Sequence, residues 1–307
     1  MLNISGTFTG TVTLNATASG NTVNYNGAAQ TLKGTAYTNL TLSGSGAKTM
    51  PSGTSVTGTL SIPAGGAQAL VTTGQNLTVA NLTLGGLGRI NGTWGFTGSG
   101  ATNIDTTYFA SGGTGTLNVT NDTRSAPTLS VTNSPVTYDG STHAATVSAS
   151  VAGSVSNILT GGSATQTNAG TYAVTADFTP TDTTSYTTLT GASAGSFIIN
   201  QADQTISFGA LAGKIYGDAD FGVSATSTSG LAPTFTSQTT GVCTVSGATV
   251  HIVSAGTCTI RASQAGDSTY NAAPDVDQSF TVATKTLTVT ATGTNKLYDG
   301  TTVATVT

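Results

Sequence analysis

Short stretches that alternate apolar and polar residues recur through the first part of the chain. Three of them, Leu40–Leu42, Leu60–Ile62 and Leu82–Leu84, start 20 and 22 residues apart. Alternation with a period of two residues predicts strands with one buried face. Glycine, asparagine and serine between the stretches supply positive-φ corners. We therefore expect residues 1–122 to form a β-solenoid similar to a β-helix, in which each coil stacks on the last; a β-sandwich is the competing interpretation.

The second part of the chain repeats with a longer period, of about 80 residues. A Tyr-Asp-Gly sequence at residues 138–140 returns at 298–300, and a degenerate Tyr-Gly-Asp copy lies between them at 216–218. Other landmarks keep the same order, such as Ala-Gly-Thr-Tyr at 169–172 and Ala-Gly-Thr-Cys at 255–258. Alternating strands bounded by frequent turn signals are typical of a small β-sandwich.

The two kinds of repeat predict an all-β chain with four segments. The segments are a β-solenoid at 1–122, β-sandwich modules at 127–201 and 202–283, and the start of a further, truncated module at 284–307. A last module that stops after one motif indicates that the chain is a piece of something longer. We expect tandem immunoglobulin-like modules after the solenoid.

These repeats resemble known bacterial modules. The Tyr-Asp-Gly-Thr-Thr start and the Ala-Gly-Thr-Tyr strand resemble the glycine-rich repeats called MBG or YDG domains. Residues 204–283 resemble a bacterial Ig-like domain through Cys243–Gly247 and Ala255–Ile260. Residues 39–49 are similar to β-helical repeats of filamentous-haemagglutinin-like and autotransporter passenger proteins. The resemblance implies a very large secreted or surface-anchored bacterial protein, an adhesive or stalk role, and no catalytic residues.

Composition supports strands and leaves little material for catalysis. The chain has 40 Gly, and all 12 of its acidic residues are Asp, whereas helices favour Glu, Lys, Arg, Leu and Met. Two His, two Cys and scattered Asp supply few acid/base or metal-ligand candidates. Eight Lys and Arg with a net charge of -4 give no basic stripe for nucleic acid. We expect no catalytic residues, no cofactor, no metal site and no membrane insertion within this chain.

The two cysteines are the sharpest local feature. If strands 242–245 and 257–260 lie adjacent, Cys243 and Cys258 can form a disulfide across them; buried free thiols and metal ligation remain alternatives. His251 lies between the cysteines, but a structural zinc site needs four ligands, so we expect His251 on a sheet surface.

The remaining candidates are aromatic and acidic. Trp94 is expected to fill a coil interior, with sugar stacking as the alternative. Asp218 with Asp220, and Asp275 with Asp277, are expected to be solvated turn carboxylates, with calcium binding as the alternative. The tyrosine of each Tyr-Asp-Gly turn is expected to be a packing anchor under that turn, with a ligand platform as the alternative. The structural residues of the repeat motif are Tyr138, Asp139, Gly140, Tyr216, Tyr298, Asp299 and Gly300.

Together these patterns predict a non-enzymatic extracellular scaffold or stalk segment of a large repetitive bacterial surface adhesin. We expect its signal peptide outside this chain and further repeats of the same polypeptide as its neighbours. One alternative is a module that binds a glycan or host protein through the solenoid face or module loops. A polysaccharide-degrading β-helix enzyme is a weaker alternative, because residues 1–122 contain few acidic and basic side chains.

Overall fold

The computed structural model describes residues 1–9 and 11–290, and every regular element in them is a strand. The prediction of an all-β chain is therefore confirmed. No helix capable of crossing a membrane occurs in the described residues. The chain divides into two compact units: the first takes in Met1–Ser134, Thr142–Gln166 and Tyr172–Phe197, and the second takes in Pro135–Ser141, Thr167–Thr171 and the chain from Ile198 onward. The predicted motif residues Tyr298, Asp299 and Gly300 lie outside the described residues.

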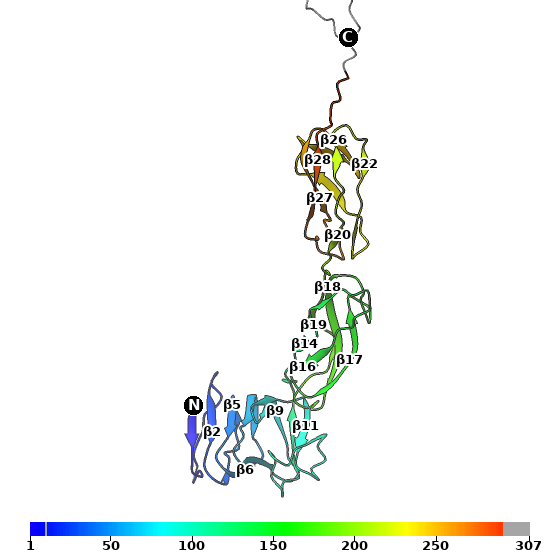
Figure 1. The fold of residues 1–307 in the computed structure, drawn as a ribbon. Coiled ribbons are helices and arrows are strands. Elements are labelled where there is room, and N and C mark those ends of the chain that lie inside the picture. The colour runs from blue at the N-terminus through cyan, green and yellow to red at the C-terminus, as the bar shows by residue number, and fades with distance from the viewer. Residues whose placement is uncertain (10, 291–307) are drawn as a thin grey trace, which may run out of the picture. The chain divides into compact units, whose positions relative to one another are not determined.

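The first unit opens with a sheet of mostly parallel strands that follow one another in chain order (Figure 1). Its main strands are β1 (Leu2–Ile4), β2 (Thr22–Tyr25), β5 (Asn39–Leu42), β7 (Ser55–Ile62), β9 (Asn76–Leu84) and β13 (Thr116–Val119). The short strands β4 (Ala36–Tyr37), β10 (Leu87–Gly88), β11 (Gly92–Gly95) and β12 (Asn103–Ile104) complete it. A second parallel sheet contains β3 (Gln30–Thr31), β6 (Gly46–Met50) and β8 (Ala67–Val71).

Equivalent apolar residues of successive strands lie side by side in this sheet. Leu40 pairs with Leu60, and Leu60 pairs with Leu82. All three side chains are fully buried. Met50 and Val71 from the other sheet belong to the same core. The alternation read from the sequence thus marks side chains that belong to one continuous core.

Trp94 and Lys48 are among the long polar or amphipathic side chains buried in this region. Trp94 fills the core as predicted, and its Nε1–H donates a hydrogen bond to the Ile90 carbonyl (3.0 Å). Lys48 is also fully buried. Its ammonium donates to three backbone carbonyls, those of Gly27 (2.7 Å), Ala28 (2.5 Å) and Ser45 (2.7 Å). Burial lowers the pKa of Lys48.

The rest of the chain consists of small sheets. Residues 129–200 contain β14 (Leu129–Val131) with β16 (Val147–Ala149), and the sheet β15-β19-β18-β17, whose strands are Val136–Thr137, Leu189–Asn200, Gly170–Pro180 and Gly153–Thr160. Residues 206–283 contain β20 (Ile206–Phe208) with β23 (Ala225–Ser227); β22 (Phe221–Gly222), β26 (Thr249–Ile252) and β25 (Cys243–Ser246); and the sheet β21-β28-β27-β24, whose strands are Lys214–Ile215, Val276–Ala283, Gly256–Ser263 and Thr234–Ser237.

The two regions share a two-stranded and a four-stranded sheet, and the second region adds the sheet β22-β26-β25; the shared part supports the repeat read from the sequence. In each, a two-residue strand pairs in parallel with the end of the last strand: Val136 pairs with Ile199, and Lys214 pairs with Val282. We call residues 127–201 the first module and residues 202–283 the second module.

Candidate functional site

The second module contains the predicted Cys243–Cys258 disulfide, with the two Cα atoms 5.7 Å apart. Both cysteines are fully buried in the module core. The reasoning that led to the pairing was wrong in one respect, because the strands of the two cysteines are not adjacent. Cys243 lies on β25 and Cys258 on β27, and these strands belong to different sheets. Both side chains are buried in the same core, so the bridge joins the two sheets there.

His251 lies on the module surface, as expected. Its Nδ1 is 2.7 Å from the Asp220 carboxylate, and the His251 side chain is largely exposed. The neighbouring residues of β26, Val250 and Ile252, are buried. The residues that the structure describes contain no cluster of three or more potential metal-ligating side chains.

The paired aspartates that suggested calcium have other partners. Arg261 binds both Asp277 (2.8 Å) and Asp275 (3.3 Å). Its hydrogen bonds lower the pKa of Asp277. Asp220 faces His251, and Asp218 accepts a hydrogen bond from the Ile215 N–H (2.9 Å). These carboxylates therefore act as surface ion-pair and turn partners, in line with the solvated-turn interpretation.

A loop that begins with aspartate and ends with tyrosine occurs in each module, at residues 182–186 and 267–270; we call it the Asp–Tyr loop. In the first module, Asp182 Oδ1 accepts the N–H groups of Thr184 (3.0 Å) and Ser185 (3.1 Å). In the second, Asp267 Oδ1 accepts those of Thr269 (2.7 Å) and Tyr270 (2.9 Å). The aspartate thereby holds each loop in a tight turn.

Each Asp–Tyr loop binds the residue at which the chain enters its module. The Ser125 N–H donates to the Ser185 carbonyl (3.0 Å), and the Thr187 N–H donates back to Ser125 (3.1 Å). In the second module, the Ala202 N–H donates to the Thr269 carbonyl (3.0 Å), and the Asn271 N–H donates to Ala202 (2.9 Å). Both contacts are single parallel bridges. Sequence reasoning missed this role of the loops.

The same loops also contact the chain that precedes their module. Within the first unit, the Thr184 carbonyl accepts a hydrogen bond from the Ile90 N–H (3.0 Å), and the Ser185 hydroxyl accepts one from Arg89. Arg89 is buried, and its guanidinium lies 6.0 Å from the centroid of the Trp94 ring. The loop therefore forms part of the junction between residues 1–122 and the first module.

Within the second unit, the equivalent contact is aromatic. The Tyr270 ring packs edge-on against Tyr138, with centroids 5.6 Å apart and planes at 81°. The Gln201 side chain donates to the Asp267 carbonyl. Tyr138 thus packs against the following module's loop, which differs from the predicted role as an anchor under its own Asp-Gly turn.

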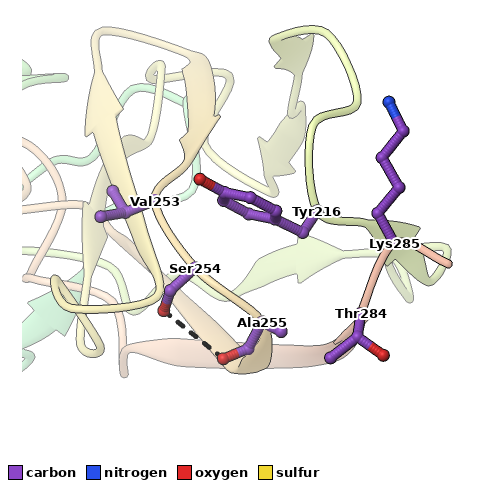
Figure 2. A pocket seen from close by; sticks show the side chains of 6 residues that line it. All are labelled: Tyr216, Val253, Ser254, Ala255, Thr284 and Lys285. Carbon is purple, nitrogen blue, oxygen red and sulfur yellow. Dashed lines mark hydrogen bonds between the residues drawn. The ribbon is translucent and has the colours of Figure 1, made fainter. Parts of the chain in front are cut away.

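Tyr216, the equivalent of Tyr138 in the second module, lies at the surface with 48% of its area exposed. This exposure does not fit the predicted role of Tyr216 as a packing anchor. It lines a pocket of about 310 Å³ together with Val253, Ser254, Ala255, Thr284 and Lys285. Figure 2 shows the Tyr216 ring lying between the loop of Val253–Ala255 and the segment of Thr284 and Lys285. This pocket is the clearest candidate binding site in the described second module.

No protein-family model matches this chain, and no curated protein matches it significantly.

Proposed function

We propose that this chain is a non-enzymatic extracellular scaffold, or stalk segment, of a large repetitive bacterial surface adhesin. Its first region is a β-solenoid, and the modules after it are Ig-like β-sandwiches. The chain spaces a binding region away from the cell by placing folded units in series.

The repeated Asp–Tyr loop is the observation that carries the proposal. A stalk needs more than folded units in sequence, because each linker must resist bending. The loops at 182–186 and 267–270 each bind the chain at the module entry and also contact residues that precede it. Because the same kind of contact occurs at the entry of both modules, it supports the role of a spacer.

The disulfide supports an extracellular location. Disulfides persist in oxidising compartments and are rare in the cytosol. Small sandwich modules have limited cores, so a bridge between Cys243 and Cys258 gives stability where chaperones and reducing systems are absent. The low charge content, 7% of residues, supports a surface that makes few nonspecific electrostatic contacts.

Small-angle X-ray scattering of the 307-residue chain at several concentrations tests the proposal. A compact chain of this length has a radius of gyration of about 19 Å. A stalk requires a value well above this, with a scattering profile that does not change with concentration. A radius near the compact value would contradict the stalk function.

A glycan array and a panel of extracellular matrix proteins provide the matching functional test. A spacer binds none of them with submillimolar affinity. Saturable binding that is lost when one face of residues 1–122 is substituted would favour the alternative, a glycan- or protein-binding module.

A further inference from the structure

The Tyr216 pocket has a filled counterpart in the first module. The Tyr138 N–H donates to the Asn200 carbonyl (2.9 Å), and the Tyr216 N–H donates to the Ala283 carbonyl (2.8 Å). Each tyrosine therefore directly follows a two-residue strand that pairs with the end of its module's last strand. The two tyrosines occupy equivalent positions.

The stretches that surround the two tyrosines are also equivalent. In the first module, residues 135–141, 167–171 and the chain from Ile198 onward are grouped with the second compact unit, whereas the rest of that module is grouped with the first. The pocket in the second module is lined from the corresponding stretches, namely Tyr216, Val253–Ala255, and Thr284 with Lys285. Tyr138, which contacts Tyr270 in the first module, thus has its equivalent in Tyr216, which lines a pocket in the second.

The recurring surface differs between the modules in its exposure. Tyr138 is half-buried and has Tyr270 against its ring, whereas Tyr216 is 48% exposed. Thr167 is half-buried, whereas its equivalent, Val253, is 42% exposed. An apolar side chain replaces a polar one at this more exposed position. Exposed apolar and aromatic side chains gathered at a pocket mark an interaction site.

We propose that the Tyr216 pocket is the docking site for the Asp–Tyr loop of a following module in the same polypeptide, whose tyrosine packs edge-on against Tyr216. The inference rests on the proposed stalk function. It also rests on continuity with the Tyr138–Tyr270 contact, which fills the equivalent surface. A third Tyr-Asp-Gly copy at 298–300 begins the next repeat in the sequence, outside the described residues.

Charge and tethering favour this occupant. Thr284 and Lys285 directly follow Ala283, as Gln201 directly follows Asn200, and the Gln201 side chain binds the carbonyl of the loop aspartate. Lys285, the equivalent of Ala202, lies one residue beyond this contact and adds a cation to the pocket that would receive a loop carrying an aspartate. A module joined by a short linker has an effective local concentration in the millimolar range, so one aromatic contact with a few hydrogen bonds is sufficient for docking.

The test joins a second copy of residues 203–283 directly after Lys285 of the chain, so that Thr284 and Lys285 stay in the pocket and take the linker positions of Gln201 and Ala202. The second copy carries Ile215→Val and Val253→Ile, so that its peptides differ in mass from those of the first copy. Hydrogen exchange with mass spectrometry then follows residues 214–217 and 253–255 of the first copy. We expect these amides to exchange about tenfold more slowly than in the original chain.

Tyr216→Ala in the first copy is expected to abolish the slowing. Ile104→Ala is the matched control, because Ile104 is similarly exposed (47%) but lies on β12 of the first unit; it is expected to leave the slowing intact. Equal exchange in the original and lengthened chains would overturn the proposal.

Sedimentation of the original chain tests whether a second copy of the chain occupies the pocket instead. Concentration-dependent dimerisation that Tyr216→Ala removes would show that the pocket takes a second copy, and would also overturn the proposal. A scattering profile typical of a stalk, together with unchanged exchange in the lengthened chain, would reject docking and leave the stalk function standing. A compact scattering profile would reject the stalk function itself.

Discussion

Residues 1–122 and the second module are both made of short strands, but they hold their cores together in different ways. Among the described residues, 22 buried side chains form one continuous core in the first region, and 12 form the core of the second module. The main parallel strands of the first region, β1, β2, β5, β7, β9 and β13, each pair with the next in this order, so the core extends along the sheet. The second module closes on itself after about 80 residues and joins its sheets with a disulfide. Where the core can extend along the chain, packing of successive strands provides the stability that the second module obtains from its disulfide.

The largest expected loss of stability comes from a cavity in the continuous core of the first region. Leu60 is fully buried between Leu40 and Leu82, so Leu60→Ala leaves a cavity and is expected to destabilise the first region by about 4 kcal/mol. Trp94, the single tryptophan, belongs to the same core and reports the transition by fluorescence during urea unfolding. Leu87→Ala, at a partly exposed site, is the control and should cost less than about 1 kcal/mol. Equal losses would refute a continuous core.

Removing the disulfide tests how the core of the second module is stabilised. Cys243→Ala with Cys258→Ala is expected to cost the second module about 3 kcal/mol, the value for a loop of this length. Hydrogen exchange at Ile260 and Ala262, both buried on β27, measures the loss. The midpoint of the urea unfolding transition that Trp94 fluorescence reports should not change. A shift in the Trp94 midpoint would mean that the two regions do not fold independently.

The buried ammonium of Lys48 makes hydrogen bonds inside the first region. Lys48→Met leaves three backbone carbonyls without their donor and is expected to destabilise the Trp94 transition by about 2–3 kcal/mol. Lys33→Met, at a half-buried lysine on the same region, should change it by less than about 0.5 kcal/mol. Unchanged or increased stability in Lys48→Met would show that the cost of burying the charge exceeds the gain from its three hydrogen bonds.

The smallest effect concerns the Asp–Tyr loop of the first module. Burial raises the pKa of Asp182, but hydrogen bonds from Ser185 and Thr184 outweigh it, and the net pKa is lowered. A lowered folded pKa contributes stability above the unfolded pKa, near 4, and that stability is lost as the pH falls through the folded value.

Thermal unfolding between pH 7 and pH 3 measures this contribution. Asp182→Asn is expected to cost less than about 1 kcal/mol at pH 7, because the side chain is exposed, and to reduce the loss of stability on acidification. Asp122, whose pKa is lowered by its hydrogen bond with Arg124, retains part of the pH dependence. An identical acid transition in Asp182→Asn would show that the loop aspartate contributes nothing to stability.

The sequence predicted the parts of this architecture that depend on periodicity. Alternation at Leu40, Leu60 and Leu82 indicated buried strands, and the structure places these residues beside one another. Alternation also placed His251 at the surface between two buried neighbours. A period of two residues specifies which side chains face inward, but not which sheet a strand joins. For this reason the pairing of Cys243 with Cys258 was predicted and its placement between two sheets was not.

The candidate site was beyond sequence reasoning for a different reason. Tyr138 and Tyr216 belong to the same motif, and nothing local to either one sets its burial. Tyr138 is half-buried because Tyr270, 132 positions away, packs against it, whereas Tyr216 is exposed. The second module brings its loop to Tyr138, and no ring contact of this kind covers Tyr216 among the described residues. The available signal was an aspartate followed by a tyrosine four positions later at 182–186 and three positions later at 267–270, but its meaning depends on the hydrogen bonds that the aspartates accept.

Pulling the chain from its two ends in a single-molecule force experiment tests the central claim, that independently folded units lie in series, most directly. We predict separate unfolding steps for the first region and for each module. Reduction should lengthen the step of the second module by roughly 5 nm, the span of the 15 residues that the disulfide shields, and leave the other steps unchanged. A single unfolding step, or a change in every step on reduction, would contradict the claim.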